Sequence, residues 1–193
     1  MALTLITAPS IEPITLAEAR MQCRIADDDT AEDALLAVCI QAAREAAEHE
    51  LGRALITQIW ELTLAAFPAG EIKLGKAQAL AITSVKYLDT ANVLQTMDPG
   101  AYALDATTSP GWLLPATGTS WPSTADVVNA VRVRFTAGYG PAAANVPAAV
   151  RQWMLVTVAA FYAQREALDA TGRVAVLPGR FVDRLLDAEK VYG

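Results

Sequence analysis

The densest group of potentially reactive side chains is an acidic run near the N-terminus, formed by Asp27, Asp28, Asp29, Glu32 and Asp33. Carboxylate oxygens are the ligands that Ca²⁺ prefers, and a metal-dependent hydrolase could use such a cluster. The spacing lacks the glycine and the terminal glutamate of an EF-hand loop. The run is more typical of a solvated loop leading into a helix whose positive N-terminal end attracts carboxylates. A metal-dependent hydrolase is therefore only a remote alternative, and no metal or other cofactor is expected.

The other residue types on which catalysis commonly depends are scarce. The single histidine, His49, is weak support for acid–base catalysis or zinc binding, since zinc sites draw three or four ligands. Cys23 and Cys39 form no CxxC pair. We expect two buried thiols, although the sequence leaves a disulfide open. No HExxH, GxSxG or P-loop pattern occurs, so we expect a protein that is not an enzyme.

The charge balance argues against general nucleic-acid binding. The chain has 15 Lys and Arg against 21 Asp and Glu, a net charge of −6, and no basic run. Binding to phosphates requires clustered basic residues. Hydrophobic residues make up 53% of the chain, which indicates either apolar surface covered by other subunits or simply an alanine-rich protein. We find no signal-peptide pattern and no apolar stretch long enough to span a bilayer, so no membrane association is expected.

Helical patterns occupy both ends of the chain. Thr15 and Glu18 fit a capping box, which predicts a short helix to about Arg24. A longer helix is predicted from Thr30 to Leu51, with Gly52 as its C′ residue. Its apolar face is formed by Leu35, Val38, Cys39, Ala42 and Ala46. Its polar side, with Glu45, Glu48 and Glu50, is expected to face solvent. After residue 140 the helical pattern returns, to about residue 168, and a last short helix is predicted from about 180 to 192. The apolar face predicted for the first of these helices contains Val150, Trp153, Met154, Thr157, Val158 and Phe161.

The central third shows the two-residue period of strands. In residues 60–64 and 131–135 apolar and polar residues alternate. Short strands separated by Gly- and Pro-containing turns are predicted between them, at residues 71–74, 80–88, 93–96, 102–104 and 112–114. The expected fold class is α+β. Helices in residues 1–55 and 138–193 form a helical body, and residues 56–137 form a central antiparallel β insertion.

Four residues of this insertion are candidate contacts to a neighbouring subunit or to tail-side proteins. Trp112 and Trp121 lie in Gly-, Pro-, Ser- and Thr-rich sequence, where exposed aromatic residues often contact partners. Trp121 could equally pack back on the sheet or anchor a partner. Arg132 and Arg134 lie on the exposed side of the last strand. They either pair with acidic residues of a neighbouring subunit or face solvent.

Taken together, several motifs resemble the head–tail connector (adaptor) family of long-tailed phages and prophages. The order and spacing of the motifs carry the resemblance, which covers the chain to about residue 167. The C-terminal run LLDAEK (185–190) departs from the family because it lacks the proline of the usual ending. The matching runs are IEPITLAEA (11–19), DDDTAEDALL (27–36), AAREAAE (42–48), TQIWEL (57–62), ITSVKYLD (82–89), VRVRFTAGYG (131–140) and VPAAVR (146–151).

The resemblance implies a structural virion protein that forms a homo-oligomeric ring, commonly a dodecamer. The ring would sit at the virion neck, between the portal protein and a stopper or tail-terminator protein, after assembly in the host cytoplasm. Double-stranded DNA would pass through it without specific binding, which suits the acidic balance. The last helix would reach the portal, with Phe181, Leu185, Leu186 and Tyr192 as candidate contacts. The alternative is a tail-completion or minor capsid protein.

Overall fold

The computed structural model describes residues 1–26, 28–76, 78–164 and 184–191. It combines α-helices with antiparallel sheets, and the α+β prediction is confirmed. The chain forms two compact units, each built from two separate segments. A β unit comprises residues 1–10 and 57–139, and a helical unit comprises residues 11–56 and 140–193. Each unit is described by itself below.

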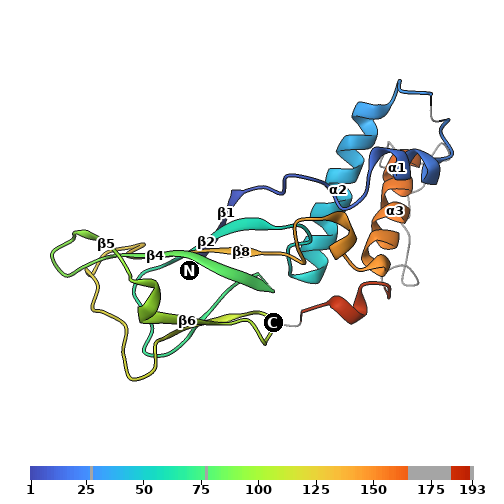
Figure 1. The fold of residues 1–193 in the computed structure, drawn as a ribbon. Helices are drawn as coiled ribbons and strands as arrows, with labels where there is room; N and C mark the ends of the chain where they lie inside the picture. The colour runs from blue at the N-terminus through green and yellow to red at the C-terminus, as the bar shows by residue number, and fades with distance from the viewer. Residues whose placement is uncertain (27, 77, 165–183, 192–193) are drawn as a thin grey trace. The chain divides into compact units, whose positions relative to one another are not determined.

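The helical unit contains α1 (Leu16–Cys23), α2 (Asp33–Leu51) and α3 (Ala148–Ala163) (Figure 1). The predicted capping box begins α1, since Glu18 N–H donates to Thr15 Oγ1 and Thr15 N–H donates to the Glu18 carboxylate. Helix α2 ends at Gly52, whose φ of +68° favours glycine. Two 3₁₀ turns, η2 (Ala143–Asn145) and η3 (Asp187–Glu189), complete the unit's described elements.

The buried face of α2 differs from the predicted one. Val38 was expected to be buried but is 63% exposed, while Glu48 was expected to face solvent but is only 6% exposed. Alanine is spread around the whole helix, so the three- and four-residue period fits more than one face. The residues that are buried are Leu36, Cys39, Ile40, Ala43, Arg44, Ala47, Glu48 and Leu51.

Helix α3 packs against both α1 and α2. The predicted face is largely confirmed, because Val150, Trp153, Met154, Thr157 and Val158 are buried. Arg151 adds a polar tie across the unit. Its Nε donates to the carbonyl oxygen of Pro13 over 3.0 Å, and its Nη2 donates to the Glu18 carboxylate.

The β unit contains a five-stranded antiparallel sheet in the order β1-β2-β8-β4-β5. Its strands are β1 (Ala2–Thr7), β2 (Gln58–Leu64), β8 (Val131–Ala137), β4 (Ala79–Leu88) and β5 (Leu94–Thr96). Leu62, Val133 and Val85 face one another in adjacent strands and are fully buried. The predicted alternation of β8 is confirmed, since Val131, Val133, Phe135 and Ala137 are buried.

A second, three-stranded sheet has the order β3-β7-β6, with strands β3 (Ile72–Lys73), β7 (Trp112–Pro115) and β6 (Tyr102–Asp105). The turn η1 (Pro99–Ala101) leads into β6. Leu113 pairs with Ile72 on one side and Leu104 on the other, and is fully buried. All strands predicted between residues 57 and 137 are therefore present.

Two features at the ends of the chain differ from the sequence analysis. Residues 2–7, assigned there to the helical body, form β1 and pair with β2. The final helix predicted for about residues 180–192 falls partly outside the described residues. Where the structure describes that segment, residues 184–186 form a turn and Asp187–Glu189 forms a 3₁₀ helix.

Gly140 occupies a position that a side chain would not fit. Its φ is +152°, and a Cβ atom there would lie 2.5 Å from Asn145 Oδ1, which accepts a hydrogen bond from Ala142 N–H. We expect Gly140→Ala to lower the free energy of unfolding by about 1–3 kcal/mol, measured by urea denaturation. Gly70→Ala is the control, because a Cβ at Gly70 meets nothing within 4 Å. Equal stability of the two variants would contradict this prediction.

Candidate functional site

The acidic run is divided among local structural contacts rather than gathered into a site. Asp33 pairs with Arg20, Glu32 accepts a hydrogen bond from the Tyr162 hydroxyl, and Asp29 accepts one from Ala31 N–H. Asp27 lies outside the described residues. Within the described ranges, no group of three His, Cys, Asp or Glu residues is placed to hold a metal ion.

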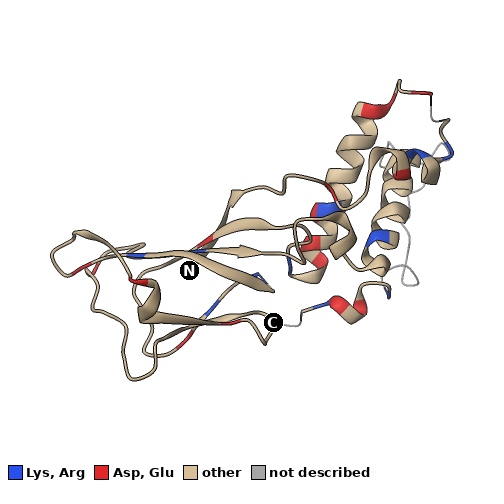
Figure 2. Ribbon diagram, viewed as in Figure 1, with Lys and Arg blue, Asp and Glu red and all other residues tan. Residues whose placement is uncertain are grey.

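The most buried charges form a cluster around Arg44 in α2. Arg44 Nε donates to Glu12 over 2.9 Å, and its Nη1 donates to Glu48 over 3.1 Å. The second Glu48 oxygen accepts a hydrogen bond from Leu55 N–H over 2.9 Å. Arg44 and Glu48 are each 6% exposed. The cluster therefore ties the segment before α1, helix α2 and the segment after α2 to one another. Figure 2 shows acidic and basic positions next to one another along α2.

Burial raises the pKa of Glu12, against the lowering effect of the Arg44 guanidinium. The nearby carboxylates of Glu48 and Glu45 add to the increase. Ionised Glu12 therefore depends on Arg44 for its stabilisation. The sequence analysis missed this cluster because it assigned Glu48 to a solvent-facing side.

Glu18 is a second charged junction, since it accepts hydrogen bonds from Thr15 and pairs with Arg151 of α3. Its pKa is lowered from the ordinary value of 4.5, first by the backbone N–H of Thr15 and also by Arg151. Stability contributed by ionised Glu18 is therefore present above about pH 4.5. It is lost as the pH falls through the lowered pKa of the folded state.

We expect Glu18→Gln to cost about 1 kcal/mol at neutral pH, which is typical of a lost helix cap. The difference from the unchanged protein should shrink as the pH falls below 4.5. Chemical denaturation between pH 3 and pH 7 measures it. Glu71→Gln, at an exposed position, is the matched acid-to-amide control and should have little effect. A cost for Glu18→Gln that is independent of pH would contradict the assignment.

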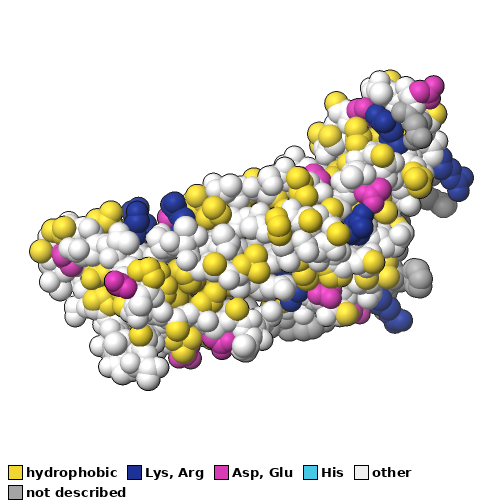
Figure 3. Space-filling view, in the orientation of Figure 1, with side chains coloured by type: hydrophobic (Ala, Val, Ile, Leu, Met, Phe, Trp, Pro, Cys, Tyr) yellow, Lys and Arg dark blue, Asp and Glu magenta, His cyan; other side chains and the backbone are white. Residues whose placement is uncertain are grey.

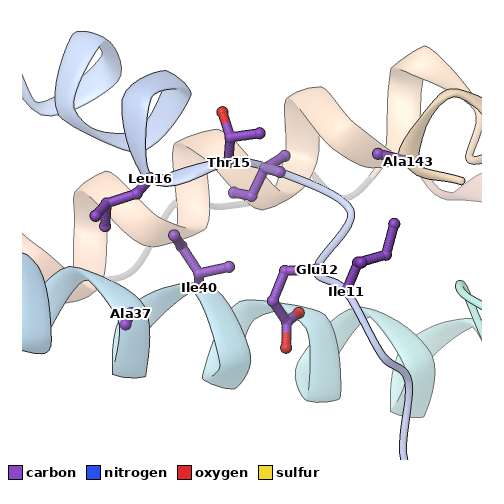
Figure 4. Close-up of a pocket in the computed structure, with 8 residues that line it drawn as sticks. Ile11, Glu12, Thr15, Leu16, Ala37, Ile40 and Ala143 are labelled. Atoms are coloured by element: carbon purple, nitrogen blue, oxygen red, sulfur yellow. The ribbon is translucent and has the colours of Figure 1, made fainter.

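An apolar groove of about 450 Å³ lies within the helical unit (Figure 4). Ile11, Leu16, Ile40 and Ala143 line it, together with the neighbouring residues of the 11–16 segment and Ala37 of α2. In Figure 4 the Glu12 carboxylate points toward α2, where Arg44 binds it. Apart from Thr15, the remaining residues that line the groove are aliphatic, so it could receive an apolar side chain.

Exposed aliphatic residues gather at one end of the β unit. Val93 lies in the turn between β4 and β5, Leu94 begins β5, and Val127 and Val128 lie in the loop before β8. Leu88 connects the two segments, because its N–H donates to Ala130 and its carbonyl accepts from Ala125 N–H. Val128 is 82% exposed. Exposed hydrophobic clusters of this kind are frequent at protein–protein contacts.

Of the two candidate tryptophans, Trp121 packs back on the β unit. Its ring stacks on Phe67 with centroids 4.9 Å apart, and its Nε1 donates to the Gly70 carbonyl over 2.6 Å. Phe67 in turn meets Tyr87 of β4 edge to face. Trp112, in β7, is half-buried. Both rings therefore belong to the packing of this unit, with part of each surface still accessible.

The two candidate arginines differ in their surroundings. Arg134 donates to Glu61 of the adjacent strand from both Nε and Nη2, over 3.1 and 2.7 Å. Arg132 is exposed and lies directly opposite Lys86 of β4. Like charges at such positions repel. Arg132 is therefore better placed than Arg134 to pair with an acidic residue of another molecule.

The four candidate portal contacts lie at the C-terminal end. Leu185 is half-buried and Leu186 is 2% exposed, whereas Phe181 and Tyr192 lie outside the described residues. The segment after Leu186 is fixed to the end of α2 by Val191 N–H to Leu51, Glu189 to Arg53, and Lys190 to Glu50. Leu185 and Leu186 therefore precede a segment that packs on the helical unit.

The two thiols are free: Cys39 is buried and Cys23 is half-buried. Burial raises the pKa of Cys23, and the proximity of Cys39 adds to the effect. Since thiolate is the reactive form, Cys23 is a poor nucleophile. No helix within the described part of the chain is both long and apolar enough to cross a bilayer.

Comparisons with known proteins agree with the resemblance in the motifs. Residues 13–91 match the model of the family described as "Phage gp6-like head-tail connector protein". No curated protein matches. A chain from the virion of a native gene transfer agent (GTA) particle is 26% identical, with a TM-score of 0.80. The match covers 100% of this chain and 97% of that one.

Two further structures share the fold over the same fractions of both chains. A chain from the neck of an empty GTA particle, computed with C6 symmetry, is 24% identical with a TM-score of 0.81. Another, from the neck of a native GTA particle computed with C12 symmetry, is 22% identical with a TM-score of 0.71. The predicted resemblance to head–tail connectors is thereby confirmed.

Proposed function

We propose, from the match of residues 13–91 to the phage gp6-like head–tail connector family, that the chain forms a ring at the virion neck. In this role each copy contacts two identical neighbours. The ring joins the portal protein to a stopper or tail-terminator protein and surrounds the passage for double-stranded DNA. The protein is structural and is not an enzyme, as expected of this family.

The observation that carries the proposal is the agreement between the family match and the full-length similarity to a GTA virion chain. The similar chains from GTA necks come from structures computed with sixfold and twelvefold symmetry. A cyclic ring needs a head-to-tail interface, in which two different surfaces of one chain meet. The exposed aliphatic end of the β unit and the groove of the helical unit are surfaces suited to such contacts.

The charge distribution supports a passage that does not retain DNA. Figure 3 shows basic side chains in several small groups, with acidic side chains on the same face, and the net charge is −6. A chain of this kind releases few counterions from DNA and therefore binds it weakly.

Among the candidate portal contacts we retain Leu185, which is half-buried, rather than Leu186, which is buried.

Particles assembled without this protein test the proposal. We expect them to yield DNA-filled heads that lack tails, and purified full-length protein added to such heads should appear as a ring at the portal vertex by electron microscopy. A gel-shift assay with double-stranded DNA at physiological salt is the companion measurement and should show no complex. Tailed, infectious particles formed without the protein would contradict the proposal. So would its recovery in the tail fraction rather than on heads.

A further inference from the structure

The strand β1 is an unprotected sheet edge. Among the residues that the structure describes, it pairs with β2 on one side only and ends the five-stranded sheet (Figure 1). Its sequence, ALTLIT, contains no charged residue and no proline, although lysine, proline or a covering segment commonly protects such edges. Leu5 and Ile6 are exposed. An uncharged, exposed edge with a high tendency to form strands is a template for pairing with another chain.

The opposite side of the same sheet has a second open edge. Strand β5 pairs only with residues 86–88 of β4, and the next contact is a hydrogen bond from Met97 N–H to the Val85 carbonyl. Among the described residues, no strand pairs with the outer side of residues 79–84. This half of β4 reads ALAITS and is also uncharged. Leu80 and Ala81 are exposed.

The two open edges match in length and direction. Residues 2–7 and 79–84 are each six residues long, and β5 would stop an incoming strand at Val85. From β1 through β2 and β8 to β4 every neighbouring pair is antiparallel. The strand β1 of a second copy in the same orientation would therefore lie antiparallel to β4, and the alternation would continue.

The apolar faces also match. Leu5 pairs with Trp60, and Ile82 pairs with Phe135, so Leu5 and Ile82 lie on the face where Trp60 and Phe135 pair. Joining the two edges with these side chains on one face would extend the core side of the sheet across the contact. The opposite arrangement would place Leu5 against the charged face that carries Glu61 and Arg134.

We propose that β1 of one copy adds to the open first half of β4 in the next copy, and that this strand pairing is a head-to-tail contact of the ring. The inference rests on the proposed function, since the strand that pairs with β4 is taken to belong to a second copy of this chain. Because the two edges are different surfaces of one chain, repetition of the contact leads from copy to copy around an axis. Pairing of β1 with β1 of a single partner would instead give a closed dimer.

Disulfide trapping tests the contact. Facing residues of paired strands approach to about 4.5–5.5 Å between Cα atoms, which a disulfide can span. In a full-length background carrying Cys23→Ser and Cys39→Ala, Ile82→Cys is combined with Leu3→Cys or Leu5→Cys, because Leu3 and Leu5 lie on the same face of β1 and sample two registers. Under mild oxidation of assembled particles, at least one double variant should give a ladder of dimers, trimers and larger species. Leu5→Cys with Val93→Cys is the matched control and should give none.

The outcomes separate the strand pairing from the proposed function. Rings visible at the neck with no ladder in either double variant that carries Ile82→Cys would overturn the pairing and leave the connector function intact. Dimers formed by Leu5→Cys alone would show two-fold pairing of β1 and would also overturn it. Absence of the protein from particles, although its circular dichroism is unchanged, would contradict the connector function and the pairing together.

Discussion

Replacing Arg44 with methionine is expected to lower the free energy of unfolding of the chain by about 3–5 kcal/mol, the usual cost of removing one partner of a buried ion pair. Methionine retains most of the aliphatic stem, so the loss of stability measures the contribution of the guanidinium group and not that of packing. The change leaves Glu48, itself 6% exposed, without its contact to Arg44. Burial already raises the pKa of Glu12, and the substitution removes the guanidinium group that favours the ionised form of this side chain.

Urea denaturation at neutral pH measures this effect, with Glu45→Gln as the control. Glu45 also contacts Arg44, at 3.5 Å, but its side chain is 59% exposed, so its loss should cost less than about 1 kcal/mol. Adding Glu12→Gln and Glu48→Gln to Arg44→Met should restore part of the stability, because the two carboxylates that Arg44 contacted are then replaced by neutral amides. If Arg44→Met lowered the free energy of unfolding by less than Glu45→Gln does, the Arg44 cluster would be open to water.

The second large effect is expected at Leu186. Leu186→Ala should cost about 2–5 kcal/mol, as for other large-to-small changes of buried leucine, because the side chain is 2% exposed. The neighbouring Leu185→Ala should cost much less, since Leu185 is half-buried. Thermal or urea unfolding of the two variants, side by side, measures the difference.

Binding to portal-containing heads gives the complementary readout. If Leu185 contacts the portal, Leu185→Ala should weaken attachment while the subunit remains stable. Leu186→Ala should reduce attachment only to the extent that it reduces the folded population. The reverse result, a stable Leu186→Ala variant that fails to attach, would assign the portal contact to Leu186 and contradict the structural role argued here.

The sequence predicted those elements whose signals are local. The capping box of Thr15 and Glu18, the glycine at the end of α2 and the alternation of β8 each depend on residues a few positions apart. All three are present in the structure. The buried face of α3 was likewise predicted, because its apolar residues are large and lie on one side of the helix.

The features that were missed depend on contacts between distant residues or on weak patterns. Glu12 meets Arg44 across 32 positions, and nothing in the sequence of either segment specifies that pair. In α2, small alanine residues surround the helix, so the period did not distinguish the face containing Val38 from the face containing Glu48. The alternation of Leu3 and Leu5 with Thr4 could have indicated β1, but its partner strand begins more than 50 positions later.

The chain contributes segments to the two units alternately, and it passes from one unit to the other at residues 10–11, 56–57 and 139–140. During synthesis on the ribosome, β2 and β4 emerge long before β8, the strand that lies between them. Until residues 131–137 have been made, the central sheet has a gap where β8 belongs, and the helical unit lacks α3. A prematurely terminated chain is therefore left with unpaired strands, which favour aggregation or degradation. Because folding depends on residues that are synthesised late, incomplete subunits are removed before assembly. In an oligomer of identical copies, this prevents one defective subunit from disrupting the complete particle.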